Sequence, residues 1–180
     1  MAGQTDYREA VIRPVAAGHV GSAKPTLPLA DENATNALAA RVAMIARPGD
    51  VLALWGGLGV GKTFFARAFI RARVGAPVEV PSPTFTLVQT YEGAKPVAAD
   101  IFHFDLFRID AAEEALELGI EDAFASAISL IEWPDRLGPF LPSQRLDVVL
   151  ADVPAAAMAR QLTLTGHGDW QQRLREAGFA

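Results

Sequence analysis

The chain has 180 residues, a length that suits one domain with a core large enough to need no covalent cross-links. It contains no cysteine, which excludes disulfides, zinc–thiolate sites and cysteine catalysis. Its 16 basic and 21 acidic residues give a net charge of −5, which argues against tight binding of nucleic acid by this chain alone. Since neither a membrane span nor a secretory signal is recognisable, we expect a cytoplasmic protein without membrane contact.

The chain begins with a segment that has no clear hydrophobic period. We therefore predict that residues 1–24 form a flexible N-terminal extension and that residues 25–180 form a single domain. Thr26–Leu29 is predicted to be a short strand. Asp31 is placed to cap a helix, because three apolar residues follow at helical spacing (Leu38, Val42 and Ile45).

The next segment carries the strongest motif in the chain. The apolar run Val51–Trp55 predicts a buried strand, and Thr63–Arg73 has helical character. Between them the sequence GGLGVGKT matches the phosphate-binding motif G-x-x-x-x-G-K-[ST]. We expect the loop amides and Lys62 to bind phosphate and the Thr63 hydroxyl to ligate Mg²⁺. The loop consists of Gly56, Gly57, Leu58, Gly59, Val60, Gly61, Lys62 and Thr63.

After this helix the chain contains several turn signals. Proline at positions 81 and 83 predicts an extended path into Thr84–Tyr91, and Glu92–Lys95 is predicted to be a hairpin turn. Val97–Ile109 is predicted to be the next strand. Period-two counting places His103 and Asp105 on the same face of it.

The remaining segments alternate between short helices and strands. We predict a short acidic helix over Ala111–Leu118 that Gly119 ends, and an apolar strand over Ile128–Trp133. Arg145–Leu150 and Arg160–Thr165 are predicted to form an edge hairpin, with a closing helix over Asp169–Ala177. Together these elements predict an α/β fold: a P-loop NTPase-like mixed β-sheet flanked by helices.

Phosphoryl chemistry also needs carboxylates that hold a metal or orient a water molecule. Asp105 and Glu132 each come late in a predicted strand, where the carboxyl ends of strands gather beside such a loop. Asp105 is interpreted as a metal ligand or a solvated strand end. Glu132 is interpreted as a metal contact, a base that orients water, or a surface ion-pair partner. His103 can reach the site or be a core histidine, and Trp133 can stack on a ligand or pack at the rim.

Four motifs, in order and at fitting distances, resemble the TsaE family, also called YjeE. They are GGLGVGKT, SPTFTLV (Ser82–Val88), HFDLFR (His103–Arg108) and EWPDR (Glu132–Arg136), within a resemblance that runs from about Leu27 to about Thr165. The resemblance implies a bacterial P-loop ATPase required for N6-threonylcarbamoyladenosine (t6A) modification of tRNA. Such a protein binds the TsaD–TsaB pair, reaches tRNA only through that complex, and hydrolyses ATP to support repeated turnover.

The resemblance also implies roles for individual residues. The phosphate loop would bind ATP, Thr63 and Glu132 would contact Mg²⁺, and Asp105 would belong to the metal or catalytic shell. Trp133 matches a family tryptophan beside the catalytic glutamate. Leu29 and Ala156 align loosely with positions that cradle the nucleotide. Two departures from the family pattern are Gly57, where relatives often carry Asp, and Phe107, where Tyr is common.

The leading hypothesis is therefore a Mg²⁺-dependent ATPase, weak alone and dependent on partners. Lys62 and Mg²⁺ would offset the developing charge, and either Glu132 or Asp105 would position the attacking water. One alternative is a nucleotide-gated binding module that does not require hydrolysis. A small-molecule P-loop kinase is a second alternative, disfavoured because the arginines after Arg73 are dispersed. A GTPase is disfavoured because no guanine-reading [NT]-K-x-D motif occurs.

Overall fold

The structure, a computed structural model, describes residues 26–94, 99–154, 156 and 158–179. The N-terminal extension predicted over residues 1–24 lies outside the described residues. So do the end of the predicted hairpin turn at Glu92–Lys95 and the start of the predicted strand Val97–Ile109.

Seven strands form one sheet in the order β1-β7-β6-β2-β5-β4-β3. The four strands β6, β2, β5 and β4 run parallel to one another in the centre of the sheet. β1, β7 and β3 pair antiparallel at its sides, so the predicted mixed α/β class is confirmed. The strands are β1 (Thr26–Leu29), β2 (Val51–Trp55), β3 (Val88–Tyr91), β4 (Ile101–Asp105), β5 (Ile128–Glu132), β6 (Leu146–Asp152) and β7 (Arg160–Gly166).

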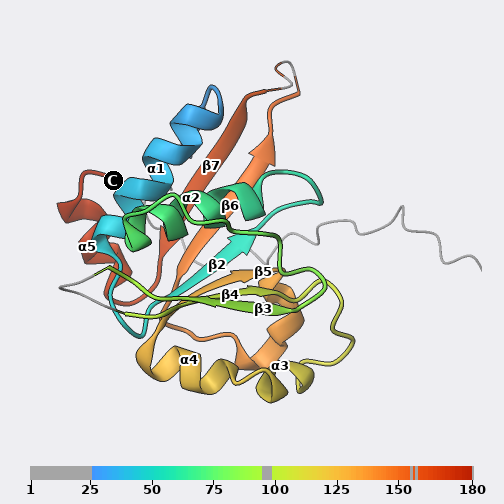
Figure 1. Ribbon diagram of the computed structural model, residues 1–180. Coiled ribbons are helices and arrows are strands. Elements are labelled where there is room, and N and C mark those ends of the chain that lie inside the picture. The colour runs from blue at the N-terminus through green and yellow to red at the C-terminus, as the bar shows by residue number, and fades with distance from the viewer. Residues whose placement is uncertain (1–25, 95–98, 155, 157, 180) are drawn as a thin grey trace, which may run out of the picture.

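Helices cover both faces of the sheet and enclose two hydrophobic cores (Figure 1). One face carries α1 (Glu32–Ile45), α2 (Lys62–Val74) and α5 (Trp170–Glu176). The other carries α3 (Glu114–Glu117), α4 (Ile120–Ser126) and a 3₁₀ segment, η1 (Pro134–Phe140). No helix among the described residues is both long and apolar enough to span a membrane.

The helix boundaries have local causes. Asp31 caps α1 as predicted, because its Oδ1 accepts a hydrogen bond of 2.8 Å from the amide of Ala34. α2 ends at Gly75, whose φ of 69° places it in the left-handed region that favours glycine. Gly119, with a φ of 73°, ends the acidic segment as predicted and separates α3 from α4. The sequence analysis did not predict α4 or η1.

Three segments differ from prediction in extent. The strand predicted over Val97–Ile109 ends earlier than predicted, because β4 stops at Asp105. There the Asp105 carboxylate accepts a hydrogen bond from the amide of Phe107, and the chain turns. The predicted helix Ala111–Leu118 is a single turn. Within Thr84–Tyr91, turns occupy positions 84–86 and only β3 is extended.

The predicted hairpin of β6 and β7 is present, but the prediction that it lies at the edge of the sheet was wrong. β6 pairs with β2 on its other side, and β7 pairs with β1. The edges are therefore β1 and β3. Alternating hydrophobicity reports which face of a strand is buried but not how many neighbours hydrogen-bond to it, so the pattern of β6 could not reveal its interior position.

Candidate functional site

The phosphate-binding loop connects β2 to α2 at the carboxyl end of the parallel strands. Gly56, Gly59 and Gly61 adopt positive φ angles of 137°, 76° and 111°, so they permit a path that other residues take only with strain. Gly56 also has no room for a side chain. A Cβ there would lie 2.5 Å from the carbonyl oxygen of Leu150. The predicted strand, loop and helix are thus all present.

Lys62 lies at the first position of α2 and is only 4% exposed. Its ammonium donates hydrogen bonds to the carbonyl oxygens of Gly56 (2.9 Å) and Gly57 (2.8 Å). It also lies 3.9 Å from the centre of the Trp133 ring, within the range of a cation–π contact. Burial lowers the pKa of Lys62 from its ordinary value of 10.5, and nearby carboxylates, first Glu132 and then Asp105, oppose that shift.

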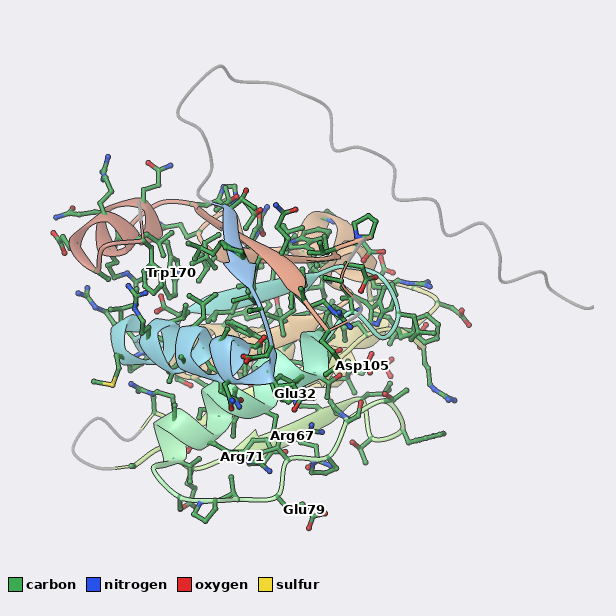
Figure 2. The ribbon with its side chains drawn as sticks, turned by 90° about the horizontal axis from the view of Figure 1, so that it is seen from above. Glu32, Arg67, Arg71, Glu79, Asp105 and Trp170 are labelled. Carbon is green, nitrogen blue, oxygen red and sulfur yellow. The ribbon has the colours of Figure 1, made fainter. Side chains whose placement is uncertain are left out.

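Two carboxylates meet at the ends of adjacent parallel strands. Asp105 ends β4, Glu132 ends β5, and the two are paired in the strand register. Their exposed fractions are 4% and 3%, so neither is a solvated strand end or a surface ion-pair partner. Figure 2 shows Asp105 beside the first turn of α2. The sheet therefore brings both predicted carboxylates to the phosphate loop.

Each carboxylate is held by hydrogen-bond donors. Glu132 Oε2 accepts from the Thr63 hydroxyl at 3.0 Å, and Glu132 Oε1 lies 3.0 Å from His103 Nε2. Asp105 Oδ2 accepts from the Thr84 hydroxyl at 2.7 Å. These bonds compensate the burial of two negative charges. His103 is completely buried and contacts Glu132. It is therefore both a core histidine and a residue that reaches the site, the two interpretations that the sequence left open.

The oxygen atoms at this site are of the kind that Mg²⁺ prefers. Thr63, Asp105 and Glu132 offer one hydroxyl and two carboxylates, whereas Mg²⁺ commonly takes one or two carboxylates and completes its shell with water and substrate phosphates. Among the described residues no cluster of three or more His, Cys, Asp or Glu side chains has metal-ligand geometry. The donor set therefore fits a metal that is bound together with a phosphate ligand.

Two clefts flank the loop. The first, of about 270 Å³, is lined by residues that include Lys62, Thr63, Asp105, Glu132 and Trp133. Trp133 adopts a positive φ of 59° and its ring lies 4.9 Å from that of Phe107. Ser82 and Thr84 line the same cleft, at the start of the segment Ser82–Val88. Most predicted site residues thus surround one opening.

The second cleft, of about 240 Å³, lies on the other side of the loop and was not predicted. It is formed by the start of α1 and by residues of β6 and β7, and its lining includes Asp31, Thr35, Val60, Leu150, Met158 and Arg160. Arg160 Nε donates to the carbonyl oxygen of Val60 at 3.1 Å. Apart from Val60, which belongs to the phosphate loop, these residues come from distant parts of the chain that no local motif marks.

The structure does not place Leu29 or Ala156 in the lining of either cleft. Leu29 is 3% exposed and packs in the core beside α1, whereas Ala156 is exposed in the connection from β6 to β7. Each lies two residues from a residue that lines the second cleft, because Leu29 precedes Asp31 and Ala156 precedes Met158. Roles for these two residues stay a prediction.

Comparison with known proteins matches residues 29–162 to the family model of the threonylcarbamoyl adenosine biosynthesis protein TsaE. The chain belongs to the TsaE family. It is 39% identical over 122 residues to the tRNA threonylcarbamoyladenosine biosynthesis protein TsaE of Rickettsia bellii, covering 68% of this chain and 83% of that one. To the Bacillus subtilis protein of the same name it is 35% identical over 144 residues, covering 79% and 85%.

The fold of a solved structure agrees with this membership. The crystal structure of Bacillus subtilis YdiB aligns with a TM-score of 0.67 and 28% sequence identity, covering 84% of this chain and 92% of that one. The resemblance inferred from the four sequence motifs is thereby confirmed. The phosphate loop, Asp105 and Glu132 of this TsaE-family chain all lie within residues 29–162, the part that matches the family model.

Proposed function

We propose that this TsaE-family protein binds and hydrolyses ATP with Mg²⁺ and acts in the t6A modification of tRNA. The observation that carries the proposal is the convergence of Lys62, Thr63, Asp105 and Glu132 on one cleft beside a phosphate-binding loop. The names of the Rickettsia bellii and Bacillus subtilis relatives, tRNA threonylcarbamoyladenosine biosynthesis proteins, support the pathway.

The two clefts on either side of the loop suggest how ATP is oriented. The first cleft contains the ammonium and both carboxylates, so it suits the γ-phosphate and a metal. The second has apolar side chains from Val60, Leu150 and Met158, so it suits the nucleoside. Loop amides at the start of α2 then lie against the phosphates between them.

Hydrolysis needs a group that accepts a proton from water. Asp105 Oδ1 is held by the backbone amide of Phe107, whereas Glu132 Oε2 is held, among the described residues, only by the side-chain hydroxyl of Thr63, a donor that can rotate. Glu132 is therefore the better placed base. It takes a proton from water as the water oxygen bonds to the γ-phosphorus, and the bond to the bridging oxygen of ADP breaks.

Thr63, Asp105 and Glu132 would hold Mg²⁺ against the phosphates. When bound, Mg²⁺ supplies positive charge that neutralises the β- and γ-phosphate oxygens. Lys62 adds a second positive charge in the same cleft, where its ammonium lies against the Trp133 ring. These residues would thus position the reacting groups and stabilise the charge of the transition state, which are the main contributions of a protein to phosphoryl transfer.

We further propose TsaD and TsaB as partners, with tRNA reached only through them. A net charge of −5 supports indirect contact with RNA, because a protein that holds the RNA backbone alone needs a basic surface. Low turnover by the isolated chain is expected where a partner completes the site, as in other P-loop proteins.

The experiment is multiple-turnover formation of t6A on a substrate tRNA with purified TsaD, TsaB, threonylcarbamoyl-adenylate and ATP. Wild-type protein is compared with Glu132→Gln, which keeps the size of the side chain and removes its charge. Glu121→Gln, at an exposed position of α4, is the matched control. We expect Glu132→Gln to lose the stimulation, with ATP hydrolysis reduced about 100-fold or more, and Glu121→Gln to retain both.

Equal stimulation by wild type and Glu132→Gln would refute the need for hydrolysis and favour the nucleotide-gated binding module. If wild-type protein gives no stimulation, the proposed role in t6A formation is wrong.

A further inference from the structure

His103 is a completely buried residue that the proposed chemistry has not yet used. It lies in the middle of β4, and the strand register places it opposite Gln89 of β3 and Leu130 of β5. It shares a strand face with Asp105, and its Nε2 lies 3.0 Å from Glu132 Oε1. It therefore contacts the proposed base from inside the sheet, and it is not among the residues that line the first cleft.

The direction of this hydrogen bond follows from the chemistry of the two groups. An ionised carboxylate only accepts, so His103 Nε2 carries the hydrogen and donates it. His103 Nδ1 has no hydrogen-bond partner among the described residues. A ring with its hydrogen on Nε2 leaves Nδ1 as a lone-pair nitrogen, which avoids burying an unpaired N–H donor.

The two donors to Glu132 differ in what happens to them when a nucleotide binds. The Thr63 hydroxyl on Oε2 belongs to the phosphate loop, and its oxygen would also ligate the metal there. His103 is fixed between two strands and has no exposed surface. His103 is therefore the donor to Glu132 whose position does not depend on the metal or the phosphate loop.

We propose that His103 is a positioning residue, which holds Glu132 Oε1 so that Oε2 faces the metal and the attacking water. The proposal rests on the proposed ATPase function and adds to it a residue that acts through Glu132. A carboxylate with one oxygen fixed can rotate little about its terminal bond, and small errors in such orientation reduce rates strongly. Comparable buried partners of metal-binding side chains typically change activity or metal affinity about 10- to 100-fold when removed.

The test compares three variants at this position. His103→Gln retains a donor close to the place of Nε2, His103→Asn is polar but too short to reach Glu132, and His103→Leu removes the donor with similar volume. His167→Leu is the matched control, because it removes another histidine that contacts a carboxylate, Asp147 at 2.7 Å, outside the site.

Two quantities are measured for each folded variant. One is ATP hydrolysis, resolved into kcat and KM. The other is the factor by which Mg²⁺ tightens ATP binding, obtained from calorimetric titrations with and without Mg²⁺. For His103→Leu and His103→Asn we expect kcat to fall about 10- to 100-fold. The Mg²⁺ factor falls too, and KM rises only as far as this factor falls. Mg²⁺-free ATP affinity is unchanged, and His103→Gln restores most of both quantities.

A coupling measurement separates positioning from a general packing role. In a Glu132→Gln background, His103→Leu should lower the residual rate by no more than about twofold, because the group that His103 orients is no longer a base. His167→Leu should keep the wild-type kcat and Mg²⁺ factor. If His103→Leu is unfolded, His103→Asn carries the same comparison.

Wild-type kcat and an unchanged Mg²⁺ factor in His103→Asn or His103→Leu would overturn the positioning role. A parallel loss of kcat and Mg²⁺-free ATP affinity without recovery in His103→Gln would also overturn it, because only a packing role moves both. A wild-type protein that binds ATP with Mg²⁺ but does not hydrolyse it refutes the proposed function instead, and the Mg²⁺ factor still tests how His103 places Glu132.

Discussion

The contacts of Lys62 predict a measurable division of roles between this lysine and Glu132. Lys62→Met keeps most of the buried aliphatic chain and removes the ammonium that now donates to the carbonyl oxygens of Gly56 and Gly57. A hydrogen bond to a charged group contributes about 1.5–3 kcal/mol net. Binding a phosphate draws the ammonium away from contacts that it already has, including the Trp133 ring at 3.9 Å, so the lower end of that range applies.

We therefore expect Lys62→Met to weaken ATP binding by about 1.5 kcal/mol, which is roughly tenfold in Kd. Adenosine binding should not change, because it lacks phosphates. The stability of the free protein should change little, since burial already opposes the charge on Lys62 and lowers its pKa. For the same reason ATP affinity of the wild type should fall at alkaline pH, as the ammonium loses its proton below the ordinary value of 10.5, and Lys62→Met should lack this dependence.

Isothermal titration calorimetry with ATP and adenosine, for Lys62→Met and Glu132→Gln, measures both effects. Glu132→Gln should bind ATP within about threefold of wild type while losing hydrolysis. An equal loss of ATP affinity in both variants would refute the division of roles. Wild-type ATP affinity in Lys62→Met would show that the ammonium does not contact the phosphates.

Two further predictions concern the framework of the site. Gly56→Ala should lower the free energy of unfolding by about 2 kcal/mol and weaken ATP binding, because the added Cβ would meet the carbonyl oxygen of Leu150. Gly57→Ala is the control, because nothing lies within 4 Å of its added Cβ. Equal urea midpoints for the two variants would contradict the prediction. Asp147→Asn should lower the free energy of unfolding at pH 7 by about 2 kcal/mol. Burial alone would raise the pKa of Asp147, but hydrogen bonds outweigh it and lower the pKa below the ordinary 3.8; they come from Arg145, Trp55 and His167. The stabilisation by the Asp147 carboxylate is then complete above pH 3.8 and is lost as the pH falls through the lower pKa of the folded protein. In urea unfolding, the difference in unfolding free energy between wild type and Asp147→Asn should therefore narrow below pH 3.8. A difference that stays constant down to acid unfolding would contradict this prediction.

The sequence predicted the parts of the site whose signals are local. The phosphate loop is contiguous, and its glycines, Lys62 and Thr63 each have a fixed role in a strand–loop–helix unit. Asp105 and Glu132 are far apart in sequence. They were still found, because each ends an apolar strand and parallel strands bring such ends to one edge of the sheet.

Other features depend on register and on packing between distant segments. The contact of His103 with Glu132 needs β4 and β5 to be adjacent with Asp105 opposite Glu132, and no pattern within either strand specifies that. The interior position of β6 likewise follows from its pairing with β2. The second cleft combines Asp31 with Arg160, which lie close because β1, just before Asp31, pairs with β7.

Hydrogen bonds also connect the site to the segment Ser82–Val88. Thr84 donates to Asp105 at 2.7 Å and contacts Ser82 at 2.8 Å, so the first residues of Ser82–Val88 are held by a proposed metal carboxylate. The next residue, Phe85, is 83% exposed. A carboxylate that turns to a metal must weaken its bond to Thr84, because the same oxygen cannot serve both at full strength. Under the proposed function, metal ligation by Asp105 would therefore loosen its hold on Thr84, the residue before the exposed Phe85.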